Sequence, residues 1–148
     1  MKCKKELDER QLLQRGNVFQ HGILLFFVLV LANAFLKEEG VVWAEGMHEN
    51  LLIAWAVIAL CLGEFAIRDI YPMGGGMSVL YIVEGVAGLL LCGLCTFHGV
   101  TGREPILAGH TLTRNGAQLI QGAIMVALLL VFVGKRLNNY KRGDEDEA

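Results

Sequence analysis

Three titratable side chains lie within or beside long apolar runs of the sequence: His21, Glu64 and Glu84. A charge at the centre of a bilayer costs roughly 2.5–3.5 kcal/mol on insertion scales, so a carboxylate at that depth either takes up a proton or finds a partner. We expect all three side chains in the cytoplasmic half of the membrane, with Glu84 the deepest. Together they form a candidate site for binding a cation or relaying a proton.

Each of the three also has a simpler interpretation. Arg68 follows Glu64 by four residues, which places the two on one helix face as an ion pair near the membrane surface. Glu84 has no such local partner and would need a hydrogen bond from Tyr81, His21 or the backbone, or a proton of its own. His21 stands near the start of an apolar run, where an interfacial histidine is common.

Cys92 and Cys95 form a C-x-x-C pair, a candidate redox pair that can cycle between thiols and a disulfide. Four-helix membrane thiol oxidoreductases that pass electrons to quinone use such a pair. Those enzymes need an accessible pair and commonly a second one, whereas the remaining cysteines here are Cys61, within an apolar run, and Cys3, near the start of the chain. Packing of small cysteine side chains between helices is the alternative.

Metal, cofactor and nucleic-acid sites have little support in the sequence. Glu45 and His48 form an E-x-x-H, but it lies in a loop beside a glycine, and the chain contains no H-x-x-x-H. It also contains no nucleotide-binding glycine motif and no G-x-S-x-G. The net charge of -2 argues neither for nor against nucleic acid, but the chain has no basic patch with interleaved aromatic residues. We therefore predict no metal, no cofactor and no nucleic-acid partner.

The elements that carry these residues are four apolar segments. Hydrophobic residues make up 54% of the 148 residues and charged residues 19%, and the charges cluster between the apolar segments. The segments span about residues 18–36, 51–67, 77–97 and 117–134, each close to the ~20 residues that a helix needs to cross a bilayer. The sequence predicts an all-α fold: a four-helix transmembrane bundle made of two antiparallel hairpins.

The distribution of Lys and Arg predicts the orientation. Five precede the first span, one (Arg68) follows the second and four follow the last, so ten of the 13 lie on one side. The positive-inside rule then places both termini in the cytoplasm. We expect residues 1–17 to form a charged cytoplasmic helix ending at Gly16 and Asn17, and residues 135–148 to form a charged cytoplasmic tail with a frayed, solvated end.

Small residues predict the faces on which the helices pack, because association in lipid depends on close approach and polar contacts. In the second span, Ala59 and Gly63 lie in a stripe of small residues. In the third span, Gly85 and Gly88 lie on a small, polar face that should turn inward and carry Glu84 with it. That inward face consists of Tyr81, Glu84, Gly85, Gly88, Cys92 and Cys95, and the bulky outward face consists of Val79, Ile82, Val83, Val86, Leu90, Leu94 and Phe97.

The segments "LDERQLLQRGN" (7–17) and "ENLLIAWAVIALCLGEFAIRDIYPMGGG" (49–76) carry a resemblance to a class of proteins. A charged segment before the first span and an Arg-aromatic-Gly turn after the second resemble small multi-pass membrane proteins of unknown function from Gram-positive bacteria. The resemblance implies a bacterial cytoplasmic (plasma) membrane location. It implies no activity and no site residues.

These observations favour an integral membrane protein that acts in an accessory, regulatory or scaffolding role. Its expected partners are the lipid bilayer and either a second copy of itself or another membrane protein. One alternative is a small proton- or cation-coupled transporter that uses Glu84. A second is a membrane thiol-disulfide oxidoreductase that uses Cys92 and Cys95. The sequence favours a protein that is not an enzyme.

Overall fold

The computed structural model describes residues 9–68, 70 and 76–145, with side chains as far as residue 140. Its four long helices are α1 (Glu9–Glu38), α2 (His48–Ile67), α3 (Gly76–Val100) and α4 (Arg114–Glu145). All four are long and apolar enough to cross a membrane. The predicted all-helical chain with four membrane-spanning candidates is therefore confirmed. The predicted turn at residues 69–75 lies outside the described residues, except for Ile70.

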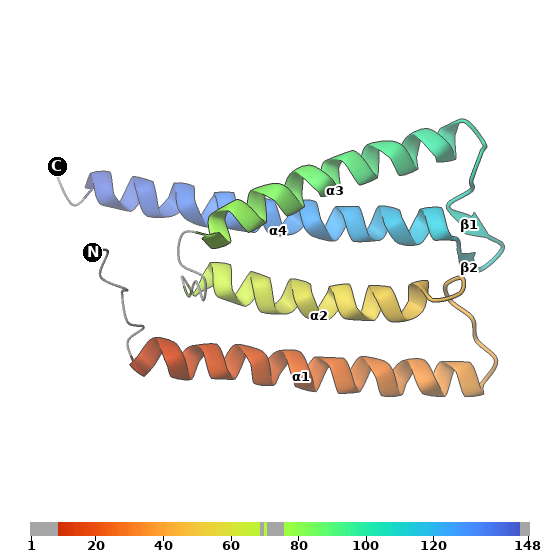
Figure 1. The fold of residues 1–148 in the computed structure, drawn as a ribbon, viewed down its shortest axis with the longest axis horizontal. Coiled ribbons are helices and arrows are strands. Elements are labelled where there is room, and N and C mark those ends of the chain that lie inside the picture. The colour runs from red at the N-terminus through yellow and green to blue at the C-terminus, as the bar shows by residue number, and fades with distance from the viewer. Residues whose placement is uncertain (1–8, 69, 71–75, 146–148) are drawn as a thin grey trace.

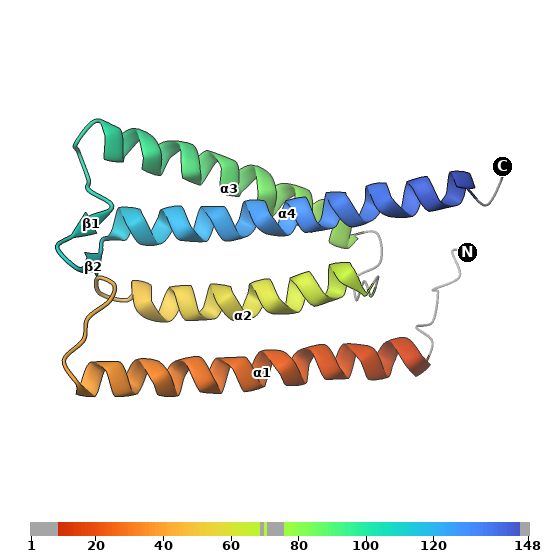
Figure 2. The same cartoon turned by 180° about the vertical axis from the view of Figure 1, so that it is seen from behind.

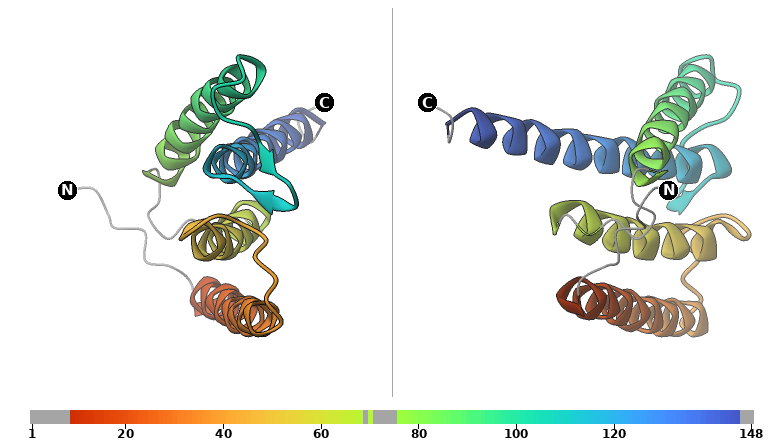
Figure 3. Two further views of the ribbon diagram at one scale, coloured as in Figure 1. Left: turned by 90° about the vertical axis from the view of Figure 1, so that its right-hand side faces the viewer. Right: turned by 60° about the vertical axis from the view of Figure 1, so that its left-hand side comes forward.

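The helices lie side by side in the order α1, α2, α4, α3 (Figures 1 and 2). The main packing contacts join α1 to α2, α2 to α4, and α4 to α3. Within the described residues α1 makes no comparable contact with α3 or α4. Viewed along the helices, α3 lies to one side of the line of the others (Figure 3, left). The arrangement is an open row in which α1 forms one edge, and it differs from a closed bundle.

The chain reverses direction at each connection, so the start of α1 and the end of α4 lie at the same end of the molecule (Figure 1). We call this end the terminal end and the opposite end the cap end. Two helices differ from the sequence prediction at the terminal end. Helix α1 runs unbroken through Gly16 and Asn17, and α4 continues to Glu145 where we expected a frayed tail. A glycine costs a helix only about 1 kcal/mol, and the helix formers around Gly16 outweigh that cost.

The cap end is built from the two connections that meet there. Helices α1 and α3 both end in a Schellman motif with a glycine of positive φ, Gly40 (75°) and Gly102 (69°). The connection between α3 and α4 contains the two-residue strands β1 (Leu107–Ala108) and β2 (Thr111–Leu112), which pair with each other. This ladder was not predicted, because two residues are too few for a pattern of alternation.

Backbone hydrogen bonds tie the first connection to β2. The amide of Leu112 donates to the Trp43 carbonyl (2.9 Å), and the amide of Glu45 donates to the Leu112 carbonyl (2.8 Å). Ala44 pairs with Leu112 in a parallel bridge and is fully buried. These residues, 42–45 and 107–114, form what we call the cap. It joins α1 and α2 to α3 and α4 through main-chain contacts.

Two clusters of buried side chains lie near the terminal end. In the larger one, the Tyr81 ring of α3 stacks on the Phe132 ring of α4 with centroids 4.7 Å apart, and Ala66 of α2 packs against both helices. The smaller cluster joins Val18 of α1 to Phe65 and Ile70. Van der Waals packing of this kind is the main source of helix association in lipid, where burial of apolar surface offers little gain.

Candidate functional site

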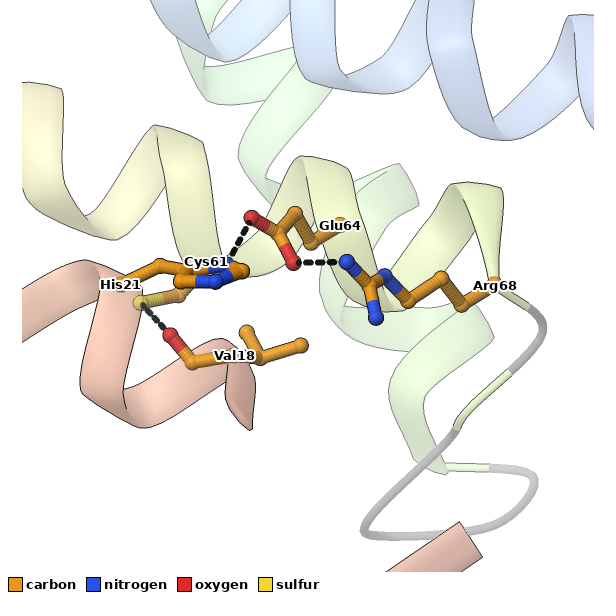
Figure 4. A network of polar contacts seen from close by, with 5 residues as sticks. All are labelled: Val18, His21, Cys61, Glu64 and Arg68. Carbon is orange, nitrogen blue, oxygen red and sulfur yellow. Dashed lines mark hydrogen bonds and ion pairs between the residues drawn. The ribbon is translucent and has the colours of Figure 1, made fainter. Parts of the chain in front are cut away.

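The clearest polar site in the membrane-spanning part is a cluster on α1 and α2 toward the terminal end (Figure 4). His21 Nδ1 lies 2.8 Å from Glu64 Oε1, and Arg68 Nη2 lies 3.1 Å from Glu64 Oε2. A carboxylate can only accept, so Nδ1 carries the hydrogen and donates it. The structure thus brings together two of the three predicted ion-site residues, His21 and Glu64, and adds the predicted Glu64–Arg68 pair.

The three side chains of this cluster are only partly buried. The exposed fractions are 50% for His21, 20% for Glu64 and 37% for Arg68. Contacts at this exposure contribute on the order of 0.2–1 kcal/mol each, because water or headgroups compete for the charges. The carboxylate lies between His21 and Arg68: its Oε1 is paired with His21, and its buried Oε2 forms the ion pair with Arg68 but has no hydrogen bond among the described residues. The cluster therefore links α1 to α2.

Helices α1 and α2 approach each other most closely beside this cluster. A Cβ atom added to Gly22 would lie 2.5 Å from Cys61 Sγ, so only glycine fits there without movement. The Cys61 thiol lies 3.9 Å from the Val18 carbonyl of α1 (Figure 4). We did not predict Gly22 as a packing residue from the sequence. A single glycine in an apolar run carries no periodic signal.

Glu84 does not join the cluster, so the predicted three-residue site is not assembled. Its Oε2 atom is buried and has no hydrogen-bond partner among the described residues. Of the partners we considered, the Tyr81 hydroxyl donates to the Leu62 carbonyl (2.6 Å), and His21 is paired with Glu64. In the described part of the chain, no group of three His, Cys, Asp or Glu side chains could hold a metal ion.

Cys92 and Cys95 are free thiols that pack against α4. Cys95 is 3% exposed, and its carbonyl accepts a hydrogen bond from Asn115 Nδ2 at 3.1 Å. The Cys92 thiol lies 3.8 Å from the Leu119 carbonyl and fills the space beside Gly122. This geometry suits packing of both side chains against α4.

Two glycines of α3, Gly85 and Gly88, lie where α3 packs tightly against α4. A Cβ atom on Gly88 would lie 2.8 Å from the Gly122 carbonyl oxygen, and one on Gly85 would overlap the Leu129 side chain. On α2, Ala59 packs against the larger cluster, whereas a Cβ atom added to Gly63 would come no closer than 4.0 Å to its nearest neighbour, Leu128 Cδ2. Gly85, Gly88 and Ala59 therefore lie in packed interfaces, and Gly63 is not at a close approach.

A second polar network, toward the cap end, was not found by sequence reasoning. Trp43 Nε1 donates to Asn33 Oδ1 (2.7 Å), and Asn33 Nδ2 lies 3.4 Å from Asn50 Oδ1. Lys37 Nζ forms an ion pair with Glu49 Oε2 at 2.6 Å, although Glu49 is 1% exposed. In the sequence, Lys37 and Glu49 belong to a charged connection and look solvent-exposed. In the structure Lys37 lies in the last turn of α1 and Glu49 in the first turn of α2.

No family model, curated protein or solved structure matches this chain. The polar groups of both networks are used mainly between neighbouring helices. Among the described residues, buried carboxylate oxygens of Glu49, Glu64 and Glu84 lack a hydrogen-bond partner, but Glu49 and Glu64 form ion pairs and no ion pair is seen for Glu84. The arrangement can hold helices together in lipid, and it presents no assembled catalytic or metal-binding constellation within the described residues.

Proposed function

We propose that this chain is an integral protein of a bacterial cytoplasmic membrane, built from two antiparallel hairpins with both termini in the cytoplasm. Its proposed role is that of an accessory, regulatory or scaffolding protein that acts through helix contacts with a membrane partner. The shared end of α1 and α4 and the ten Lys and Arg residues assigned to that side support the orientation.

The observation that carries the proposed role is the position of α1 at the edge of the row. Of its 30 residues only Val18, Gly22 and Asn33 are buried, and its main packing contact is with α2 alone. Lipid tails are as apolar as the side chains on the open face, so a partner helix can replace lipid there without first displacing protein. An edge helix of this kind suits a subunit that docks against another membrane protein.

The test is purification of the tagged chain in a gentle detergent from its native membrane, with mass spectrometry of the proteins that accompany it. We expect a stoichiometric partner. We also expect the combined changes Phe27→Ala and Leu31→Ala, on the exposed edge of α1 (59% and 58% exposed), to reduce its recovery. The matched control, Val86→Ala with Leu90→Ala on the exposed face of α3, should leave recovery unchanged.

Recovery that falls equally for both pairs would argue against α1 as the docking edge. A chain that purifies without a partner would argue against the accessory role itself. Neither result depends on folding of a destabilised variant, because all four side chains lie on exposed surfaces and make few contacts within the chain.

One specific observation favours a second candidate, a proton- or cation-coupled transporter. A buried carboxylate oxygen without a hydrogen-bond partner in a membrane-spanning helix is costly, and such groups often mark ion pathways. The test is flux into proteoliposomes loaded with a pH-sensitive dye, under gradients of H⁺, Na⁺ or K⁺. If this candidate is correct, the unmodified chain produces flux, the Glu84→Gln variant produces none, and the Glu64→Gln variant still produces it. Absence of flux with the unmodified chain would eliminate it.

A further inference from the structure

An apolar groove runs along one side of the contact between α1 and α2. It has a volume of about 430 Å³ and opens to the surface of the chain. All nine lining residues are apolar or small: Phe19, Gly22, Ile23, Phe26, Val57, Ile58, Cys61, Leu62 and Phe65. His21 and Glu64 are not among them. The groove is thus separate from the polar cluster described above.

The mouth of the groove nearest the terminal end carries a positive charge. Phe19 and Phe65 meet edge to face there, with ring centroids 5.6 Å apart. The Arg15 guanidinium carbon lies 5.8 Å from the centroid of the Phe19 ring, on the same side chain that lines the groove. The contact between Arg15 and Phe19 places the positively charged guanidinium of Arg15 beside the apolar groove. No described acidic side chain forms an ion pair with Arg15.

The dimensions of the groove suit one acyl chain. Phe19 and Phe26 are seven residues apart on α1, which corresponds to roughly 10 Å along the helix axis. Half of the hydrocarbon core of a bilayer is about 15 Å thick. The groove therefore spans most of one leaflet, beginning at the level of Arg15. In the orientation proposed above, this is the cytoplasmic leaflet, whose surface carries anionic lipids.

The lining favours a lipid over a partner helix as the occupant. Close helix contacts in membranes use small residues that let two backbones approach. The two small lining residues here, Gly22 and Cys61, already fill each other's space. The other seven are bulky, and three of them are phenylalanines. A flexible acyl chain can fit between these bulky side chains, whereas a partner helix would find no stripe of small residues against which its backbone could pack.

We propose that this groove binds one acyl chain of an anionic phospholipid whose phosphate is held by Arg15. The inference rests on the membrane placement proposed above but not on the accessory role. It assigns the α1–α2 surface a lipid ligand of defined charge. The edge of α1 that carries Phe27 and Leu31 remains free for a protein partner.

The test is native mass spectrometry of the full chain, delipidated in detergent and then supplied with dioleoyl phosphatidylglycerol or dioleoyl phosphatidylcholine. We expect one tightly retained phosphatidylglycerol per chain. Ile23→Trp fills the groove and should abolish retention, whereas Leu24→Trp, one residue further on the exposed surface, should not. Arg15→Gln should weaken phosphatidylglycerol binding about fivefold and remove the preference over phosphatidylcholine, and Arg10→Gln should do neither.

A photo-crosslinking amino acid at Phe26 provides a readout that does not depend on tolerance of a larger side chain. A phospholipid adduct at Phe26 supports the proposal. An adduct with a second copy of the chain or with another protein overturns it. Equal lipid retention by Ile23→Trp and Leu24→Trp also overturns it, as does retention that is indifferent to Arg15→Gln. Failure of the lipid test would leave partner recovery unaffected, so the two proposals fail independently.

Discussion

The contact between Gly88 and Gly122 allows a quantitative test of how α3 and α4 are held together. In Gly88→Ala, the new Cβ would lie 2.8 Å from the Gly122 carbonyl oxygen, 2.8 Å from Met125 Cβ and 3.2 Å from the Val126 amide nitrogen. Two of these three neighbours are backbone atoms, which cannot rotate away. The helices must therefore separate, and overpacking of this kind typically costs about 1–3 kcal/mol.

The matched control is Gly93→Ala on the same helix, where a Cβ would meet nothing within 4 Å. Both variants gain the same intrinsic preference of alanine for the helix, up to about 1 kcal/mol, so their difference isolates the clash. We expect Gly88→Ala to be less stable than Gly93→Ala by about 1–3 kcal/mol. That difference corresponds to a change of about 5- to 150-fold in the ratio of folded to unfolded chain.

The thiols of α3 supply the assay. Cys95 is 3% exposed and Cys92 lies against α4, so a thiol-reactive fluorophore reports separation of α3 from α4 during a thermal ramp in detergent. A background with Cys3→Ser and Cys61→Ser removes the other two thiols of the chain, because the free thiol of Cys61 on α2 would otherwise be labelled as well. Labelling of Gly88→Ala should begin at a clearly lower temperature than labelling of Gly93→Ala. Coincident labelling curves would refute the view that this glycine is required for the α3–α4 contact.

Three further predictions concern polar contacts. Asn33→Ala removes the acceptor of the Trp43 indole and should cost about 1–3 kcal/mol, seen as a lower melting temperature and altered tryptophan emission, whereas the exposed Gln20→Ala should change neither. Asn115→Ala removes hydrogen bonds to the carbonyls of residues 95 and 104, and should increase protease cleavage of the connection between α3 and α4; unchanged cleavage would contradict its role in holding that connection. His21→Ala should cost less than about 1 kcal/mol, because its carboxylate partner keeps an arginine; a larger fall in melting temperature would contradict the partial exposure of the cluster.

Much of α3 was predictable from helix geometry and residue size. Tyr81, Gly85, Gly88 and Cys95 are buried, whereas the seven bulky residues assigned to the opposite face are all exposed. The prediction succeeded because small residues in one stripe have few uses in a membrane helix other than close packing. The exposure of Glu84 is intermediate between those of the two faces. We predicted that Glu84 does not belong to the bulky, exposed face, and its intermediate exposure agrees with that prediction.

The residues that the sequence missed depend on how segments far apart in the chain come together. From the sequence, Glu49 and Lys37 look like charges of a solvent-exposed connection, whereas their pairing needs the last turn of α1 to lie beside the first turn of α2. The three-residue site failed for a related reason. Equal depth in the membrane does not imply contact, because the row order separates α3 from α1. The approximate depth of a residue in the membrane can be estimated from its position within a span. The order in which the helices lie side by side cannot be estimated in this way.

The two ends of the row are held by different kinds of contact, and this difference predicts where the molecule moves. At the cap end, main-chain hydrogen bonds join residues 43–45 to Leu112, and such bonds allow little displacement. At the terminal end, α1 is tied to α2 by side-chain packing and the partly exposed His21–Glu64 contact. Within the described residues, the main packing contact of α1 is with α2 and not with α4.

We therefore expect α1 to pivot about the cap when it meets a partner. Spin labels at Leu12 and Leu137, both exposed and near the terminal end, should give a broad distribution of distances. Labels at Val41 and Leu107, exposed and at the cap end, should give a narrow one. Equal widths at both ends would contradict the pivot. Binding of the expected partner to the edge of α1 should narrow the Leu12–Leu137 distribution alone, since the cap is already fixed.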